Sequence, residues 1–173
     1  MISSLSRAYE RTEEMQKRGI FANLFLLQNR LQALFDHDPR NLGVTLKQFL
    51  LLVMVRQAAC RQEETTYTHL GVLLGCSRQN VKTLACQLAR KQLAVLRPHP
   101  CDGRAMCVAL SPAAEQYFAK SAAFHSEVLD TLFACYTPEE LLSLYRLMAK
   151  LHTGIQALSA QKKGGCAPCM RFF

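Results

Sequence analysis

The sequence lacks any uninterrupted run of about 18 apolar residues, the length that a membrane-spanning helix requires, although 50% of its 173 residues are hydrophobic. Acidic residues interrupt the N-terminal segment, where a secretory signal peptide would need an apolar stretch. Internal repeats and low-complexity blocks are also missing. We therefore expect a cytoplasmic protein without membrane contact, in which one hydrophobic core supports a single domain over residues 1–173.

The sequence also lacks the short motifs of common catalytic and metal sites. It contains no glycine-rich phosphate loop, no serine nucleophile elbow and no clustered pair of carboxylates. The 5 histidines are scattered without an i, i+4 pair. The triplet Asp36-His37-Asp38 precedes a proline, which favours a helix exit over a metal site. We therefore expect no enzymatic activity, no bound metal and no cofactor.

Acidic residues are few relative to basic ones. The chain has 13 acidic and 21 basic residues, giving a net charge of +8 and a pI near 9.2. Much of this excess lies in one stretch, because residues 78–104 contain six basic residues and one acid. A local positive charge of this kind favours a polyanionic partner.

Residues 68–91 have the apolar pattern of two short helices joined by a tight turn. The first helix is predicted to end at Leu74, because Gly75 is able to adopt a positive φ. Ser77 is suited to cap the second helix, which is predicted from Arg78 to Lys91. Its inward stripe recurs with a period of about 3.6 residues and consists of Val81, Leu84, Ala85 and Leu88.

A β-hairpin is predicted directly after these helices, because the apolar pattern changes to a period of two. Its strands cover residues 94–97 and 104–110. Its turn covers residues 98–103, where two prolines are unable to donate to a strand ladder. The order of two helices and a hairpin predicts a winged helix-turn-helix within residues 45–110.

The outward face of the second helix carries amides and cations but no acidic residue. Amide side chains pair with adenine edges in a major groove, while arginine and lysine contact guanine or phosphate. Arg104 is placed to enter a minor groove, and Asp102 is expected to orient its guanidinium. A merely solvated helix face is the alternative, but such a face normally mixes charge signs. The candidate DNA-binding residues are Ser77, Arg78, Gln79, Asn80, Lys82, Thr83, Gln87, Arg90, Arg97, Asp102 and Arg104.

The run LGCSRQNVKTLACQLARKQLAVLRPHPCDGRAMCVALSPAAEQYF resembles the MarR (multiple antibiotic resistance regulator) family of bacterial transcription factors. Members commonly carry Asp-Arg-Arg before a strand that ends in Leu-Thr, whereas this chain has Asp102-Gly103-Arg104 and Leu110-Ser111. Gly103 thus removes one expected basic contact. The resemblance extends more weakly from about Met15 to Ala160. The resemblance implies a homodimeric transcriptional regulator that binds DNA and responds to a small aromatic or phenolic effector.

Long amphipathic helices flank the predicted DNA-binding region. The first two helices are predicted over residues 18–35 and 46–61. The segment before them, residues 2–17, is either an extra helix or an irregular lead-in. Residues 112–135 and 138–158 form the last two, with more apolar side chains than one helical hairpin covers. We therefore predict dimerisation by residues 1–44 and 111–160. A two-fold axis would place the two winged helix-turn-helix regions of the dimer on a near-palindromic operator.

The 8 cysteines are expected to be reduced in a cytoplasmic protein. Cys86 lies beside cations on the second helix of the predicted helix-turn-helix, where its oxidation would block DNA binding. The alternative is a small residue that is tolerated on a helix surface and has no function. Cys166 and Cys169 form a C-x-x-C pair in the predicted tail, residues 161–173. This pair lacks the context of a thioredoxin-like or zinc site. The alternatives are thiols that bind a soft metal or become oxidised, and thiols without a function.

The sequence therefore predicts a mainly α, winged helix-turn-helix regulator with a two-stranded wing and dimerising terminal helices. We expect it to act as a repressor whose DNA affinity responds to a small molecule or a redox signal. One alternative is a winged-helix module that binds an acidic protein. Another is a thiol or metal sensor with the same fold.

Overall fold

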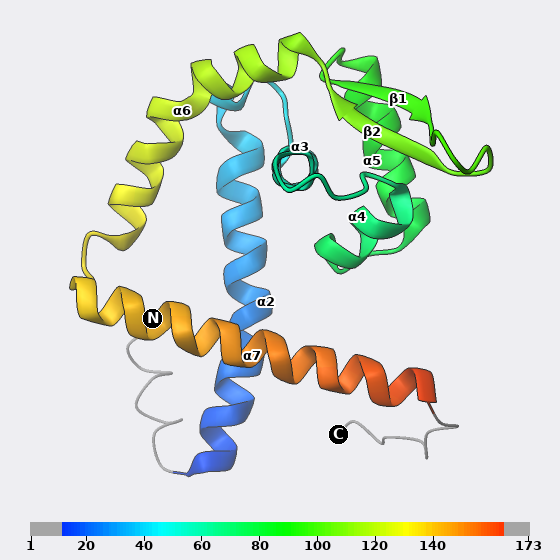
Figure 1. Cartoon of the computed structure of the whole chain (residues 1–173). Helices are drawn as coiled ribbons and strands as arrows, with labels where there is room; N and C mark the ends of the chain where they lie inside the picture. The colour runs from blue at the N-terminus through cyan, green and yellow to red at the C-terminus, as the bar shows by residue number, and fades with distance from the viewer. Residues whose placement is uncertain (1–11, 165–173) are drawn as a thin grey trace. The chain divides into compact units, whose positions relative to one another are not determined.

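The structure, a computed structural model, describes residues 12–164 and divides them into two compact units at Ala122 and Ala123. Helix α6 (Pro112–Phe133) contains this boundary, and α7 (Pro138–Gly164) lies in the second unit. The prediction of a mainly helical fold with one two-stranded antiparallel sheet is confirmed for the described residues. The remaining elements, all in the first unit, are α2 (Glu13–His37), the 3-10 helix η1 (Pro39–Asn41), α3 (Leu46–Cys60), α4 (Tyr67–Leu74), α5 (Arg78–Arg90), β1 (Ala94–Pro98) and β2 (Met106–Leu110) (Figure 1).

The core of the first unit is built from one apolar face of each short element. Helix α3 contributes Leu51, Leu52 and Val55, and α4 contributes Leu70. The predicted inward stripe of α5 is confirmed, because Val81, Leu84, Ala85 and Leu88 are all buried. Complete burial of a Leu or Val side chain contributes about 1.5–3 kcal/mol each. These contacts therefore hold α4 and α5 on a common base formed by α3.

Helix α2 begins earlier than the sequence pattern indicated. It starts at Glu13, where the Thr12 hydroxyl caps the first turn by accepting a hydrogen bond from the Met15 amide at 3.2 Å. Acidic side chains in the first turn favour this start, since they lie at the positive end of the helix dipole. Residues 13–17 therefore belong to the same helix as residues 18–35, and residues 1–11 lie outside the described part of the chain.

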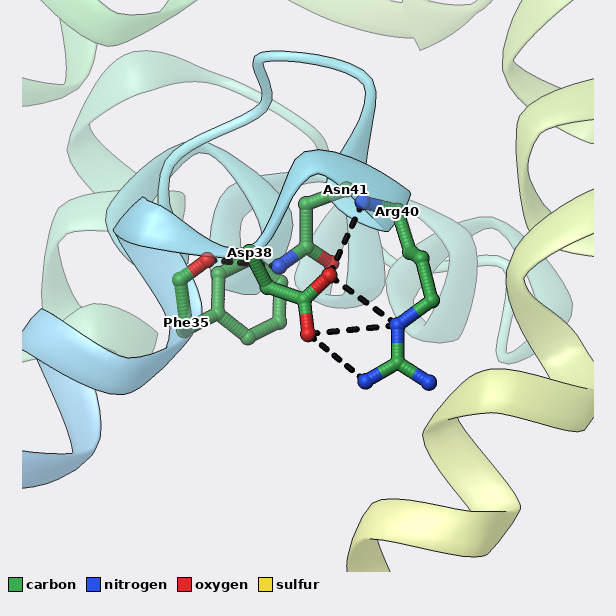
Figure 2. A network of polar contacts seen from close by, with 4 residues as sticks. All are labelled: Phe35, Asp38, Arg40 and Asn41. Carbon is green, nitrogen blue, oxygen red and sulfur yellow. Dashed lines mark hydrogen bonds and ion pairs between the residues drawn. The ribbon is translucent and has the colours of Figure 1, made fainter.

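The Asp36-His37-Asp38 segment forms the predicted helix exit. Asp38 accepts hydrogen bonds from the Arg40 amide at 2.9 Å and from its guanidinium at 2.8 Å, as Figure 2 shows. These contacts hold the pKa of the Asp38 carboxyl below its usual value. Asn41 is 1% exposed and donates from Nδ2 to the Phe35 carbonyl at 2.6 Å. Asp36 accepts from the Leu46 amide at 2.6 Å, which connects the exit of α2 to the start of α3.

The two strands pair from Ala94 with Leu110 to Pro98 with Met106. The hairpin is also tied to the segment before α4, because the Val108 amide donates to the Thr65 carbonyl at 3.0 Å. The second strand begins at Met106 and not at Arg104, since the Ala105 amide closes the turn by bonding to the Asp102 carbonyl at 2.9 Å. This hairpin is the predicted wing.

Helix α7 of the second unit starts with a capping box. The Thr137 amide donates to Glu140 at 2.8 Å, and the Glu140 amide donates to the Thr137 hydroxyl at 3.2 Å. The helix continues to Gly164, beyond the expected end near residue 158. Helix α6 ends at Phe133, two residues before its expected end. No helix among residues 12–164 combines the length and apolar character needed to cross a membrane.

Candidate nucleic-acid interface

The turn between α4 and α5 is formed by local contacts. Gly75 has a φ of 65°, as its place after α4 predicted, and the Cys76 amide donates to the Gly71 carbonyl at 2.9 Å. Ser77 caps α5 by accepting a hydrogen bond from the Asn80 amide at 3.2 Å. A Cβ atom on Gly71 would lie 2.8 Å from the Cys76 carbonyl oxygen. Glycine at position 71, which the sequence analysis did not single out, thus permits the close approach of α4 and the turn.

The structure places most of the candidate residues of α5 on one exposed surface. Their side chains project away from the buried stripe, and helix α5 contains no acidic residue. The Thr83 hydroxyl donates to the Gln79 carbonyl at 3.0 Å, so its oxygen lone pairs stay available as acceptors. The exposed candidates of α5 and its cap are Ser77, Arg78, Gln79, Asn80, Lys82, Thr83, Gln87 and Arg90.

Gln87 differs from its neighbours because its side chain is already engaged by the protein. Its Oε1 accepts a hydrogen bond from Nε2 of Gln48 at 3.0 Å, and Gln48 is a buried residue of α3. Lys91 also donates to Oε1 of Gln48, at 2.8 Å. The periodicity of α5 alone contains no signal for this contact, since Gln48 is 39 residues away in sequence.

The wing presents two exposed arginines. Arg97 lies on β1 and Arg104 follows the turn. The Asp102 carboxylate accepts from the Arg104 amide at 2.9 Å, and among the described contacts it does not bind the guanidinium. The expectation that Asp102 orients the Arg104 side chain is therefore not met. A carboxylate in a tight turn bonds preferentially to the main chain two residues later.

His99 is a second organiser of the wing turn and was not singled out from the sequence. Its Nδ1 accepts from the Cys101 amide at 3.2 Å and from the Asp102 amide at 3.1 Å. Its Nε2 lies 3.8 Å from a carboxylate oxygen of Glu64, in the segment before α4. Because Nδ1 accepts two N–H groups, the geometry fits the neutral ring with its proton on Nε2. The contacts of His99 with the turn amides and with Glu64 therefore hold the wing turn in place.

Cys86 is half-buried, unlike the other candidates on α5, so the expected outward position is only partly reached. Burial raises the pKa of the neighbouring Tyr67. The charge interaction with Cys86 raises this pKa further, whereas the interaction with Arg78 lowers it. All 6 cysteines within residues 12–164 are free thiols. Cys166 and Cys169 lie outside the described residues. Oxidation at Cys86 therefore stays a hypothesis.

The sequence matches no family model and no curated protein, but solved structures share the fold. A MarR/EmrR family transcriptional regulator from Acinetobacter sp. ADP1 is 17% identical, with a TM-score of 0.71 over 82% of this chain and 97% of that one. A probable transcriptional regulator from Pseudomonas aeruginosa is 26% identical, with a TM-score of 0.65 over 76% and 96%.

A third structure includes nucleic acid. Sco3205, a MarR family transcriptional regulator from Streptomyces coelicolor, was solved in complex with DNA. It is 21% identical, with a TM-score of 0.70 over 83% of this chain and 88% of that one. The chain has the winged helix-turn-helix fold of the MarR-family transcriptional regulators.

Proposed function

We propose that this chain is a sequence-specific, DNA-binding transcriptional regulator of the MarR family and not an enzyme. The observation that carries the proposal is the acid-free, exposed face of α5. On this face, amides and cations project from the second helix of a helix-turn-helix, the helix that enters a major groove in proteins of this architecture. Solved structures with this fold are transcriptional regulators, one of them bound to DNA.

We propose that the protein acts as a homodimer on a near-palindromic operator. Large apolar side chains are exposed on α2, where Leu34 is 73% and Phe21 60% exposed. The second unit has the same property, with Tyr145 75% and Leu147 62% exposed on α7. Apolar surface of this extent is typical of protein interfaces. A symmetric dimer would present two α5 faces to successive turns of the duplex.

Repression is the proposed sign of regulation, with relief by a small aromatic or phenolic molecule or by thiol oxidation. A ligand changes DNA affinity only if it prefers one spacing of the two DNA-binding regions over another. The support for an effector is the resemblance to the MarR family, whose members respond in this way. The same resemblance, together with the composition, supports action in the cytoplasm.

The proposed function is tested by fluorescence anisotropy with the purified full chain and a labelled duplex from immediately upstream of its own gene. Unlabelled duplex of unrelated sequence serves as competitor, and the salt concentration is varied. We expect the protein to bind as a dimer and to stay bound in the presence of competitor. The logarithm of its affinity should fall with the logarithm of the salt concentration, with a slope of about −0.9 for each phosphate contact. Sequence-independent binding would instead favour the alternative, a winged-helix module with an acidic protein partner.

A further inference from the structure

A directed chain of hydrogen bonds lies beneath the C-terminal half of α5. Gln48, which is 5% exposed, accepts from Nζ of Lys91 at 2.8 Å and from the Thr45 amide at 3.3 Å, both through Oε1. Its Nε2 donates to Oε1 of Gln87 at 3.0 Å. Lys91 also donates to the Gly43 carbonyl. The chain connects the segment before α3 to the outward-facing side chain of Gln87.

The direction of this chain is fixed by chemistry. The oxygen and nitrogen of an amide have nearly the same shape, so only their partners distinguish them. A lysine ammonium and a main-chain N–H are donors without acceptor capacity. Because both converge on one end of the Gln48 amide, that end is the oxygen. The Gln48 nitrogen must then face Gln87 and donate to its oxygen.

The consequence for Gln87 is that its oxygen faces the protein. Reading adenine with two hydrogen bonds requires the oxygen and the nitrogen of one amide to face the same base edge. The Gln87 oxygen instead faces the buried Gln48 amide, while the Gln87 nitrogen has no hydrogen-bond partner within residues 12–164. Gln87 is exposed, so this nitrogen is a donor available to DNA.

The position of Gln87 indicates which acceptor this donor meets. Base edges are contacted mainly by residues near the N-terminus of a recognition helix, whereas Gln87 lies in its last turns. Arg90, three residues further along, is an exposed cation, and cations of this kind accompany contacts with the phosphate backbone. A phosphate oxygen accepts hydrogen bonds and offers no donor, which matches a side chain that presents only N–H groups.

We propose that Gln48 is a positioning residue that fixes Gln87 as a donor to a DNA phosphate oxygen. Gln87 then adds affinity without reading a base, contrary to the adenine contact that its residue type favours. This inference rests on the proposed DNA-binding function. It assigns Gln79 and Asn80, rather than Gln87, to base recognition on α5.

The first part of the test asks whether Gln87 reads a base. The probe is the tightest duplex that the wild-type chain selects from a random-sequence library, together with every single base-pair substitution of it. Each lost hydrogen bond should weaken binding about two- to tenfold, and Gln87→Ala removes one such bond from each protomer of the dimer. We expect the same factor for every duplex. A loss of preference at one base pair in Gln87→Ala would show that Gln87 reads that base and would overturn the inference.

The second part asks whether Gln48 acts through Gln87. In Gln48→Glu the carboxylate still accepts from Lys91 and Thr45 but has no proton to donate to Gln87. The Gln87 amide should reverse and turn its oxygen toward the phosphate, so affinity should fall at least as far as in Gln87→Ala. In the Gln87→Ala background the same substitution should cause no further loss. A purely structural role for Gln48 predicts equal losses in both backgrounds and would contradict the inference.

Controls separate this result from added charge, unfolding and failure of the proposed function. Gln57→Glu adds the same charge at an exposed site of α3 and should change affinity little. If Gln48→Glu does not fold, Gln48→Met removes the donor without charge, and its effect should also vanish in the Gln87→Ala background. If the wild-type chain selects no duplex, the proposed function itself is wrong, an outcome distinct from a changed base preference in Gln87→Ala.

Discussion

The close approach at Gly71 yields a prediction about stability. A Cβ atom at this position would lie 2.8 Å from the Cys76 carbonyl oxygen, and a main-chain atom has no rotamer by which to move away. Overpacking of this kind costs about 1–3 kcal/mol, while alanine gains about 0.5–1 kcal/mol over glycine inside a helix. We therefore expect Gly71→Ala to lower the free energy of unfolding by up to about 2.5 kcal/mol.

The matched control is Gly154→Ala in α7, because a Cβ atom there has no neighbour within 4 Å. This variant should raise the free energy of unfolding by about 0.5–1 kcal/mol. Urea denaturation followed by circular dichroism measures both effects at equal protein concentration. Gly71→Ala should also weaken DNA binding, since the clash displaces the turn that leads into α5. Equal or greater stability of Gly71→Ala would refute the role given to this glycine.

Three further predictions follow from other parts of the structure. Arg104→Ala should weaken DNA binding, reduce the preference for A/T-rich flanks and make the salt slope shallower by about one contact per protomer. An unchanged anisotropy titration would remove the wing from the interface. Leu34→Glu in α2 should convert the dimer to monomers in analytical ultracentrifugation, because it places a charge on an exposed apolar face, and persistence of the dimer would exclude this face. Burial raises the pKa of Tyr117 from 10.0 to about 12, so the folded state disfavours the ionised ring and stability should fall as pH rises through this range. Tyr117→Phe should therefore lose less stability than wild type in denaturation at pH 11, because a phenylalanine ring does not ionise. An equal alkaline loss in both proteins would assign the loss to another group.

Features set by neighbouring residues were predictable from the sequence. The caps at Ser77 and Thr45, the positive φ of Gly75 and the buried stripe of α5 all depend on groups within a few positions of each other. The capping box at Thr137 is of the same kind. For this reason the winged helix-turn-helix was recognisable before its tertiary packing was known.

Features that depend on tertiary contacts were not predictable. The engagement of Gln87 requires Gln48, and the requirement for glycine at position 71 appears only when the turn folds back on α4. The role of Asp102 was misjudged because opposite charges near each other in sequence indicate an ion pair, whereas the turn offered a main-chain N–H in better geometry. Nothing in a helical period distinguishes an amide that is free from one that already has a partner.

The central claim is that the outward face of α5 reads DNA sequence. The most direct measurement is the anisotropy of the selected duplex with wild type, with Gln79→Ala/Asn80→Ala and with Lys47→Ala, which removes an exposed cation of α3 outside this face. We expect the double variant to lose discrimination against unrelated duplex, and Lys47→Ala to retain it with only a slightly reduced affinity. Retention of full discrimination by the double variant would contradict the account.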